Sequence, residues 1–65
     1  MIYQICIYYK NKEDYIKNIR LPLNEKIKVL KDKDEYVITL ESNIDTYLYT
    51  FKENEINGFE IKRIS

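Results

Sequence analysis

The 65-residue chain contains no histidine, no tryptophan and no alanine, and only one cysteine, one glycine and one proline. Without histidine, it lacks the commonest general base and the commonest metal ligand of proteins. The single cysteine, Cys6, excludes an internal disulfide bond and a zinc site built from several thiolates. The single glycine, Gly58, excludes the phosphate-binding loops, which need several glycines. We therefore expect no catalytic, metal-binding or cofactor-binding residues.

Long hydrophobic runs are also missing. No segment approaches the ~20 consecutive apolar residues of a membrane-spanning helix. The apolar residues 1–9 lack the basic region of a signal peptide, and Lys10 interrupts them early. Nothing in the cysteine content requires an oxidising compartment. We therefore expect a cytoplasmic protein that does not associate with membranes and that folds as a single small domain over residues 1–65.

Charge and composition bear on partners and origin. The 11 basic and 11 acidic residues give a formal net charge of zero, although residues 1–33 carry an excess of positive charge and residues 34–65 an excess of negative charge. The chain is rich in isoleucine, lysine, tyrosine and asparagine, all of which have AT-rich codons. This composition indicates an AT-rich genome, such as that of a bacterium, a phage or a mobile element.

Apolar and polar residues alternate along four segments in the last two-thirds of the chain. This alternation is typical of β-strands with one buried face. Each segment is rich in β-branched and aromatic residues, which favour strands, and is bounded by polar residues that favour turns. The pattern predicts strands at residues 26–31, 35–41, 46–52 and 58–64.

The spacing of these strands predicts two hairpins whose registers agree with each other. A tight turn at Lys33-Asp34 pairs Val29 with Ile38, and a loop at Ser42–Asp45 then pairs Ile38 with Tyr49. Both hairpins place their apolar residues on one face of the sheet. A slip of one residue would move a whole strand to the wrong face, so the match supports the register.

The third hairpin has two possible turns. A loop over Glu53–Asn57 pairs Phe51 with Phe59 and continues the apolar face. A tight turn at Asn57-Gly58 matches the strongest two-residue hairpin signal, but it places polar residues opposite apolar ones. We expect the longer loop, with Gly58 at the entrance of the last strand or in a β-bulge.

The first third of the chain is apolar on both faces of an extended strand. Residues Ile2–Tyr9 therefore fit a central strand, or one that is covered on both sides. Residues 12–20 have two interpretations. As a strand they form a hairpin with residues 3–9 through the loop Lys10–Asp14, and as a short helix they pack an apolar stripe on the sheet.

We therefore expect an all-β fold, a small antiparallel meander or half-open barrel of five to six strands. The alternative is an α+β fold with the order β-α-β-β-β-β, in which a short helix covers residues 12–20. An open meander leaves edge strands, and two copies of the chain can pair through such an edge into a homodimer.

Two groups of residues are candidates for contacting a partner. Tyrosines and lysines interleave near the end of the first strand, and two glutamates flank Asn54 in the loop before the last strand. Tyrosine is favoured at interfaces because its ring packs while its hydroxyl stays hydrated. The candidate partner-binding residues are Tyr8, Tyr9, Lys10, Lys12, Glu53 and Glu55.

These features favour a non-catalytic protein-binding module. We expect a small inhibitor or regulator of a host or rival protein complex, with a protein as its partner. The alternative is a small β-barrel nucleic-acid-binding protein, in which the tyrosines and lysines of the N-terminal third stack on bases and contact phosphates. The zero net charge argues against this alternative, because binders of nucleic acid usually carry a basic excess.

Overall fold

A computed structural model describes residues 1–22 and 24–65 of the chain. These residues form six β-strands and one short 3₁₀ helix, and they contain no α-helix. The all-β prediction is therefore confirmed. The elements are β1 (Ile2–Tyr9), β2 (Tyr15–Arg20), β3 (Lys26–Asp32), β4 (Glu35–Glu41), β5 (Thr46–Lys52), η1 (Glu53–Glu55) and β6 (Ile56–Arg63).

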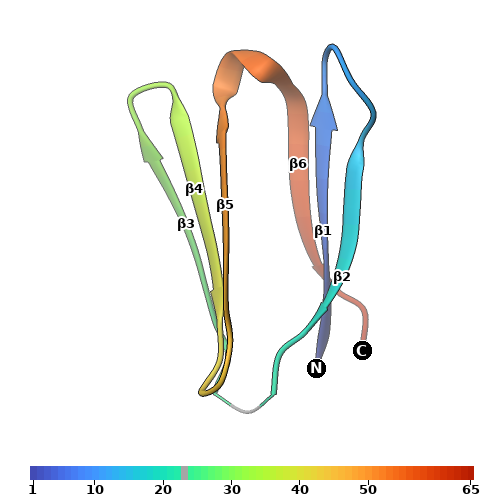
Figure 1. Cartoon of the computed structure of the whole chain (residues 1–65), viewed down its shortest axis with the longest axis vertical. Helices are drawn as coiled ribbons and strands as arrows, with labels where there is room; N and C mark the ends of the chain where they lie inside the picture. Colours follow the sequence, from blue (N-terminus) through green and yellow to red (C-terminus); the bar gives the residue numbers. More distant parts are fainter. Residues whose placement is uncertain (23) are drawn as a thin grey trace.

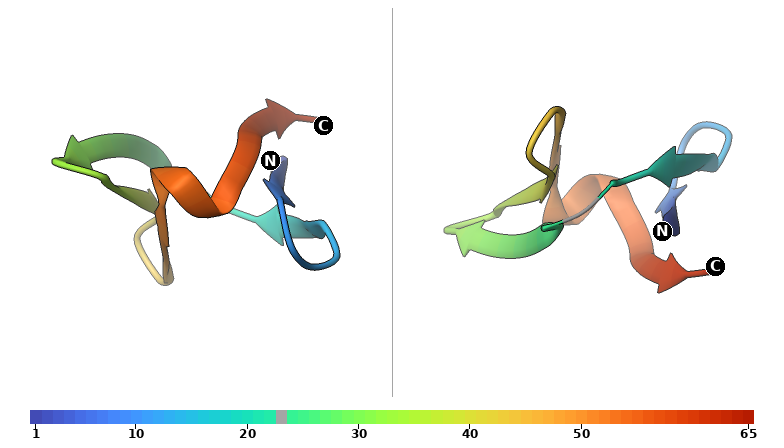
Figure 2. Two further views of the ribbon diagram at one scale, coloured as in Figure 1. Left: turned by 90° about the horizontal axis from the view of Figure 1, so that it is seen from above. Right: turned by 90° about the horizontal axis from the view of Figure 1, so that it is seen from below.

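The strands form two antiparallel sheets of three strands each, with the orders β2-β1-β6 and β3-β4-β5. Figure 1 shows β3, β4 and β5 on one side of the molecule and β6, β1 and β2 on the other. The helix η1 crosses from one sheet to the other at the upper end, and both chain termini lie near the lower end. Figure 2 shows η1, seen from above, between the two groups of strands.

The ambiguous second segment is a strand, and the α+β alternative with a helix over residues 12–20 is wrong. Strand β2 pairs with β1 through the expected loop, with Tyr3 opposite Ile19 and Ile7 opposite Tyr15. Alternation with period two buries Ile19 on the inner face, where it lies in the core. The strand form also gives β1 one of the two neighbours that a central strand requires.

The two predicted hairpins of the second sheet have the expected registers. Val29 lies opposite Ile38 across β3 and β4, and Ile38 lies opposite Tyr49 across β4 and β5. Both turns are local, because they join strands that follow each other directly. The apolar alternation and the turn residues therefore lie within a short stretch of sequence, and both predict the same register.

The third hairpin does not form, and this expectation is corrected. Strand β6 pairs with β1 in the other sheet, where Phe59 lies opposite Ile7. The helix η1 redirects the chain after β5, so that β6 becomes the second neighbour of β1. Phe51 and Phe59 still meet, with their ring centroids 5.3 Å apart, but they meet across the two sheets rather than along a hairpin.

Asn57-Gly58 lies inside β6 and forms no tight turn. Gly58 is opposite Tyr8, and the next residue of β1, Tyr9, is opposite Ile56. Asn57 is therefore the extra residue of a β-bulge, which places Gly58 beside the bulge as one of the two expected positions. The bulge increases the local twist where β6 leaves η1.

The core lies between the two sheets and draws residues from both. Aromatic side chains also join the two sheets. Tyr15 of β2 contacts Tyr49 of β5, with 3.3 Å between their hydroxyl oxygens. Burial and this contact raise the pKa of the Tyr49 hydroxyl well above its ordinary value. The buried core residues are Ile5, Ile7, Ile19, Leu21, Ile38, Leu40, Phe51 and Ile56.

The turn between β3 and β4 contains a strained residue. Lys33, the first of the two turn residues, has a φ of 58°, a left-handed conformation that glycine adopts more easily. We expect Lys33→Gly to raise the free energy of unfolding by about 0.5–1 kcal/mol, after the higher entropy of the unfolded glycine chain is subtracted. Urea denaturation measures this change. Lys33→Ala keeps the strain and is the control, and a glycine variant no more stable than the alanine variant would contradict the prediction.

Candidate functional site

Two of the predicted binding segments lie together at one end of the molecule. This loop end consists of the β1–β2 loop (residues 10–14), the β3–β4 turn (residues 33–34) and η1, at the top of Figure 1. The backbone N–H of Lys10 donates to the carbonyl of Glu55 at 3.0 Å, and the N–H of Glu53 donates to the carbonyl of Asp34 at 2.6 Å. These two bonds attach η1 to the loops on either side.

The loop end contains an open recess of about 370 Å³, lined by Tyr9, Asn11, Lys12, Asn54 and Glu55. The ammonium of Lys12 lies 4.2 Å from the ring centroid of Tyr9, a cation–π contact. The carboxylate of Glu55 accepts the backbone N–H of Lys52 at 3.0 Å and so supports the start of η1. The recess thus brings together residues of both predicted groups.

Glu53 lies on the other side of η1 and is held by residues of the second sheet. Its carboxylate forms an ion pair with Lys31 of β3 and accepts the hydroxyl of Tyr36 at 3.3 Å. The hydrogen bond from Lys31 lowers the pKa of the Glu53 carboxyl and raises the pKa of the Lys31 ammonium. Glu53 therefore helps to fasten η1 to the edge of the β3-β4-β5 sheet.

The lowered pKa of Glu53 predicts a dependence of stability on pH. Because the folded-state pKa lies below the ordinary value of 4.5, the ion pair stabilises the fold above that pH and is lost as the pH falls through the folded pKa. We expect Glu53→Gln to be less stable than the wild type at neutral pH, with the difference disappearing in acid as the pH falls through the lowered folded-state pKa of Glu53. Thermal melts across this range measure it, and a difference that stays constant with pH would contradict it. The two side chains are about half exposed, so the effect is small.

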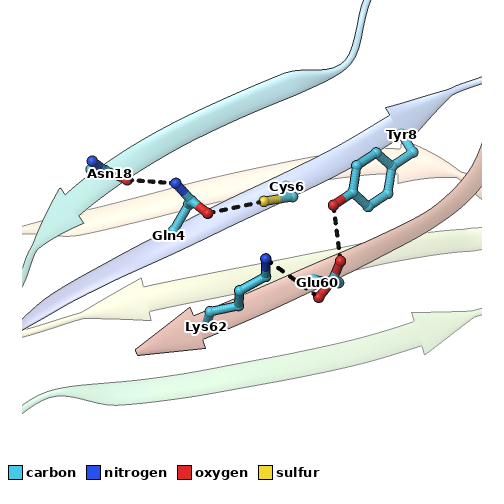
Figure 3. Close-up of polar contacts among 6 residues, drawn as sticks. All are labelled: Gln4, Cys6, Tyr8, Asn18, Glu60 and Lys62. Carbon is cyan, nitrogen blue, oxygen red and sulfur yellow. Dashed lines mark hydrogen bonds and ion pairs between the residues drawn. The ribbon is translucent and has the colours of Figure 1, made fainter. Parts of the chain in front are cut away.

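Tyr8 lies away from the recess, on the outer face of the β2-β1-β6 sheet (Figure 3). Its hydroxyl donates to the carboxylate of Glu60 at 2.9 Å, and this bond raises the pKa of the hydroxyl well above its ordinary value. Gln4 continues the same polar face, where its amide donates to Asn18 at 3.1 Å. The buried Cys6 lies between Gln4 and Tyr8 along β1, and its thiol donates to the side-chain oxygen of Gln4.

The six candidate residues therefore occupy two surfaces. Tyr9, Lys12 and Glu55 line the recess, and the backbone of Lys10 closes it against η1. Tyr8 and Glu53 face elsewhere, Tyr8 on the outer face of one sheet and Glu53 beside the edge of the other. Their role as partner-binding residues stays a prediction.

A further surface, the edge strand β3, was not among the predicted sites. All seven of its residues are exposed, and β4 is its only neighbour among the described strands. Leu30 is 62% exposed and Val29 is 45% exposed, although the alternation predicted that Val29 would be buried. The density of lysine on this strand, three in seven residues, was the signal available in the sequence, because lysine is common on exposed edges.

The outer face of the β3-β4-β5 sheet adds apolar area beside this edge. Leu30 pairs with Val37, and Leu48, 63% exposed, lies on the same face of β5. These three residues form an apolar stripe on the outer face of the sheet.

Comparison of the chain with protein-family models, with curated proteins and with solved structures gives no match. Within residues 1–22 and 24–65, no helix has the length and apolar character needed to cross a membrane. The same residues contain no group of three or more acidic, cysteine or histidine side chains placed to hold a metal ion.

Proposed function

We propose that this chain is a non-catalytic protein-binding module that inhibits or regulates a protein complex in the cytoplasm by occupying part of its surface. The observation that carries the proposal is strand β3, which is exposed over its full length and has a free edge within the described structure. A strand edge presents unpaired backbone groups, and one mode of protein recognition adds an extended segment of the partner to such an edge.

The side chains around this edge support a protein partner. Val29 and Leu30 are exposed on opposite faces of β3, and Leu48 extends the apolar area on the outer face. Exposed apolar residues that are neighbours on a surface, with polar residues around them, are typical of protein interfaces. The AT-rich composition supports an origin in a bacterium, a phage or a mobile element, whose small proteins would meet host or rival complexes.

The contacts of the basic residues favour protein over nucleic acid. Lys28 lies 3.7 Å from Glu41, and Lys31 is paired with Glu53, so two of the three lysines of β3 already have acidic neighbours. The ammonium of Lys12 covers one face of the Tyr9 ring, which a nucleic-acid base would need for stacking. Together with the zero net charge, these contacts leave little of the positive potential that nucleic-acid binding requires.

Affinity capture with paired variants tests this proposal. The tagged protein is incubated with the lysate of a bacterium that has an AT-rich genome, with and without nuclease. Bound proteins are measured by quantitative mass spectrometry. We expect one protein to bind in stoichiometric amount after nuclease treatment and to be lost with the Leu30→Glu/Leu48→Glu variant.

The control is Ile44→Glu, which places a charge at a still more exposed apolar residue in the β4–β5 loop, outside the stripe of Leu30, Val37 and Leu48. This variant is expected to retain the partner. Capture that disappears with nuclease would favour the nucleic-acid alternative. Capture that both variants reduce equally would show that the β3 surface is not the binding site.

A further inference from the structure

We propose that the free edge of β3 binds an extended, acidic segment of the partner protein as an additional antiparallel strand. This inference rests on the proposed protein-binding function and specifies the chemistry of the partner. The edge is seven residues long and carries lysine at Lys26, Lys28 and Lys31 between the apolar residues Ile27, Val29 and Leu30. Strand addition of this kind combines backbone hydrogen bonds with contacts of alternating side chains.

The register of the β3–β4 hairpin shows which backbone groups face the free edge. The two-residue turn is closed by the pair Asp32 and Glu35, and the closing pair of such a turn is hydrogen bonded. Hydrogen-bonded and non-hydrogen-bonded pairs alternate in an antiparallel ladder. The N–H and C=O groups of Ile27, Val29 and Lys31 therefore point away from β4, toward the position of an added strand.

Charge determines which strand fits this edge. Lys26, Lys28 and Lys31 are exposed, so an added strand with glutamate opposite each of them places a carboxylate beside all three lysines. Lys28 and Lys31 also keep their neighbours Glu41 and Glu53, so the largest gain is expected at Lys26. Apolar residues opposite Ile27 and Val29 extend the inner face over side chains that the β2-β1-β6 sheet leaves partly uncovered. The best ligand is thus a strand with acidic residues opposite the three lysines and β-branched residues opposite the apolar residues of β3.

A second copy of this chain fits the edge less well than an acidic strand. Symmetric antiparallel pairing of β3 about Lys28 places Lys28 opposite itself, where the two charges repel. Pairing about Val29 places Ile27 opposite Lys31, and pairing about Leu30 places Val29 opposite Lys31, although Asp32 then lies opposite Lys26 or Lys28. Each of these registers sets a lysine against another lysine or against an apolar residue, so the edge favours a different, acidic strand.

The probe for this proposal is a six-residue synthetic peptide that pairs with residues 26–31, with glutamates opposite the three lysines and valines opposite the three apolar residues of β3. The control peptide has lysine in place of each glutamate. We expect the glutamate peptide to bind the full chain in a calorimetric titration and the lysine peptide to bind about tenfold more weakly. Equal affinity of the two peptides, or no binding of either, would overturn the proposal.

Variants of Val29 test the backbone hydrogen bonds. Val29→Pro removes an N–H that faces the free edge, and proline is tolerated there in edge strands. Val29→Thr keeps both the N–H and the β-branched shape and is the matched control. We expect Val29→Pro to lose binding of the glutamate peptide and Val29→Thr to retain it. Binding by a folded Val29→Pro variant would overturn the proposal.

A charge reversal keeps the test decisive if Val29→Pro does not fold. Lys26→Glu changes an exposed side chain and is expected to weaken the glutamate peptide and to strengthen the lysine peptide. Unchanged affinities would overturn the proposal. Sedimentation tests whether a second copy occupies the edge instead. A dimer that Val29→Thr retains and Lys26→Glu alters would assign the edge to a second copy, and this result would also overturn the proposal.

The same reagents separate this proposal from the proposed function. If the wild-type chain captures a protein after nuclease treatment but the glutamate peptide does not compete, strand addition fails while protein binding stands. If no protein is captured, the proposed function itself fails. Competition by the glutamate peptide, together with loss of capture by Val29→Pro, supports both.

Discussion

Replacing Phe51 by alanine is expected to lower the free energy of unfolding by about 3–5 kcal/mol, the usual loss for a buried phenylalanine. Phe51 is only 4% exposed. Its ring centroid lies 5.6 Å from that of Tyr36 and 5.3 Å from that of Phe59. Phe51 therefore joins β5 of one sheet to β6 of the other, in the region where no strand pairing holds the two sheets together.

The size of this effect is large for so short a chain. A 65-residue domain has a free energy of unfolding of about 3–10 kcal/mol, so the alanine variant would be close to unfolded. Urea denaturation followed by circular dichroism measures the change. The control is Leu48→Ala on the same strand, which is 63% exposed and is expected to change stability by less than about 0.5 kcal/mol. A loss below about 1 kcal/mol for Phe51→Ala would contradict the aromatic contact between the sheets.

The second large effect concerns the centre of the β3-β4-β5 sheet. Ile38 of β4 is fully buried, and Ile38→Ala is expected to lower the free energy of unfolding by about 2–5 kcal/mol, because it opens a cavity between the sheets. Its cross-strand neighbour on β3, Val29, is 45% exposed. Val29→Ala is therefore expected to lose less than about 1 kcal/mol.

The comparison of these two neighbours tests where the core ends. Both residues lie on the same face of one sheet, and only their positions relative to the other sheet differ. Thermal and urea denaturation of the two variants under the same conditions measure the difference. Equal losses would show that the β2-β1-β6 sheet covers β3 as well as β4, and β3 would then not be available to a partner.

The hairpins of the β3-β4-β5 sheet could be predicted from the sequence because their information is local. The alternation of apolar residues and the lengths of the turns specify one register, in which Ile38 lies opposite both Val29 and Tyr49. The strand form of residues 15–20 was one of two interpretations that the sequence allowed, and the structure selects it by pairing Ile19 with Tyr3 of β1. Alternation determines the face of each residue and not the partner of each strand.

The partner of β6 could not be predicted for this reason. Phe59 faces the core whether β6 pairs with β5 or with β1, so its apolar pattern is the same in both arrangements. The choice depends on β1, whose second edge is unpaired without β6, and on η1, which directs the chain toward it. No short segment of the sequence specifies the pairing of β1 with β6, because these strands lie at opposite ends of the chain.

The candidate residues were predicted individually, but their grouping was not. Tyr9, Lys12 and Glu55 were selected as tyrosine, lysine and glutamate in or near exposed loops, and each would have that character in many folds. The hydrogen bond from the N–H of Lys10 to the carbonyl of Glu55 brings them to one recess. Tyr8, next to Tyr9 in the sequence, lies on the opposite face because successive residues of a strand alternate.

The sequence alone determined the turns and registers of the β3-β4-β5 sheet, because alternation and turn residues act over a few neighbouring positions. Only the tertiary structure decided that residues 15–20 are a strand rather than a helix, that the strands divide into two sheets and that β3 lies at an exposed edge. Exposure depends on how far one sheet extends over the other. That extent is set by contacts among Ile5, Ile38 and Phe51, which are far apart in the chain.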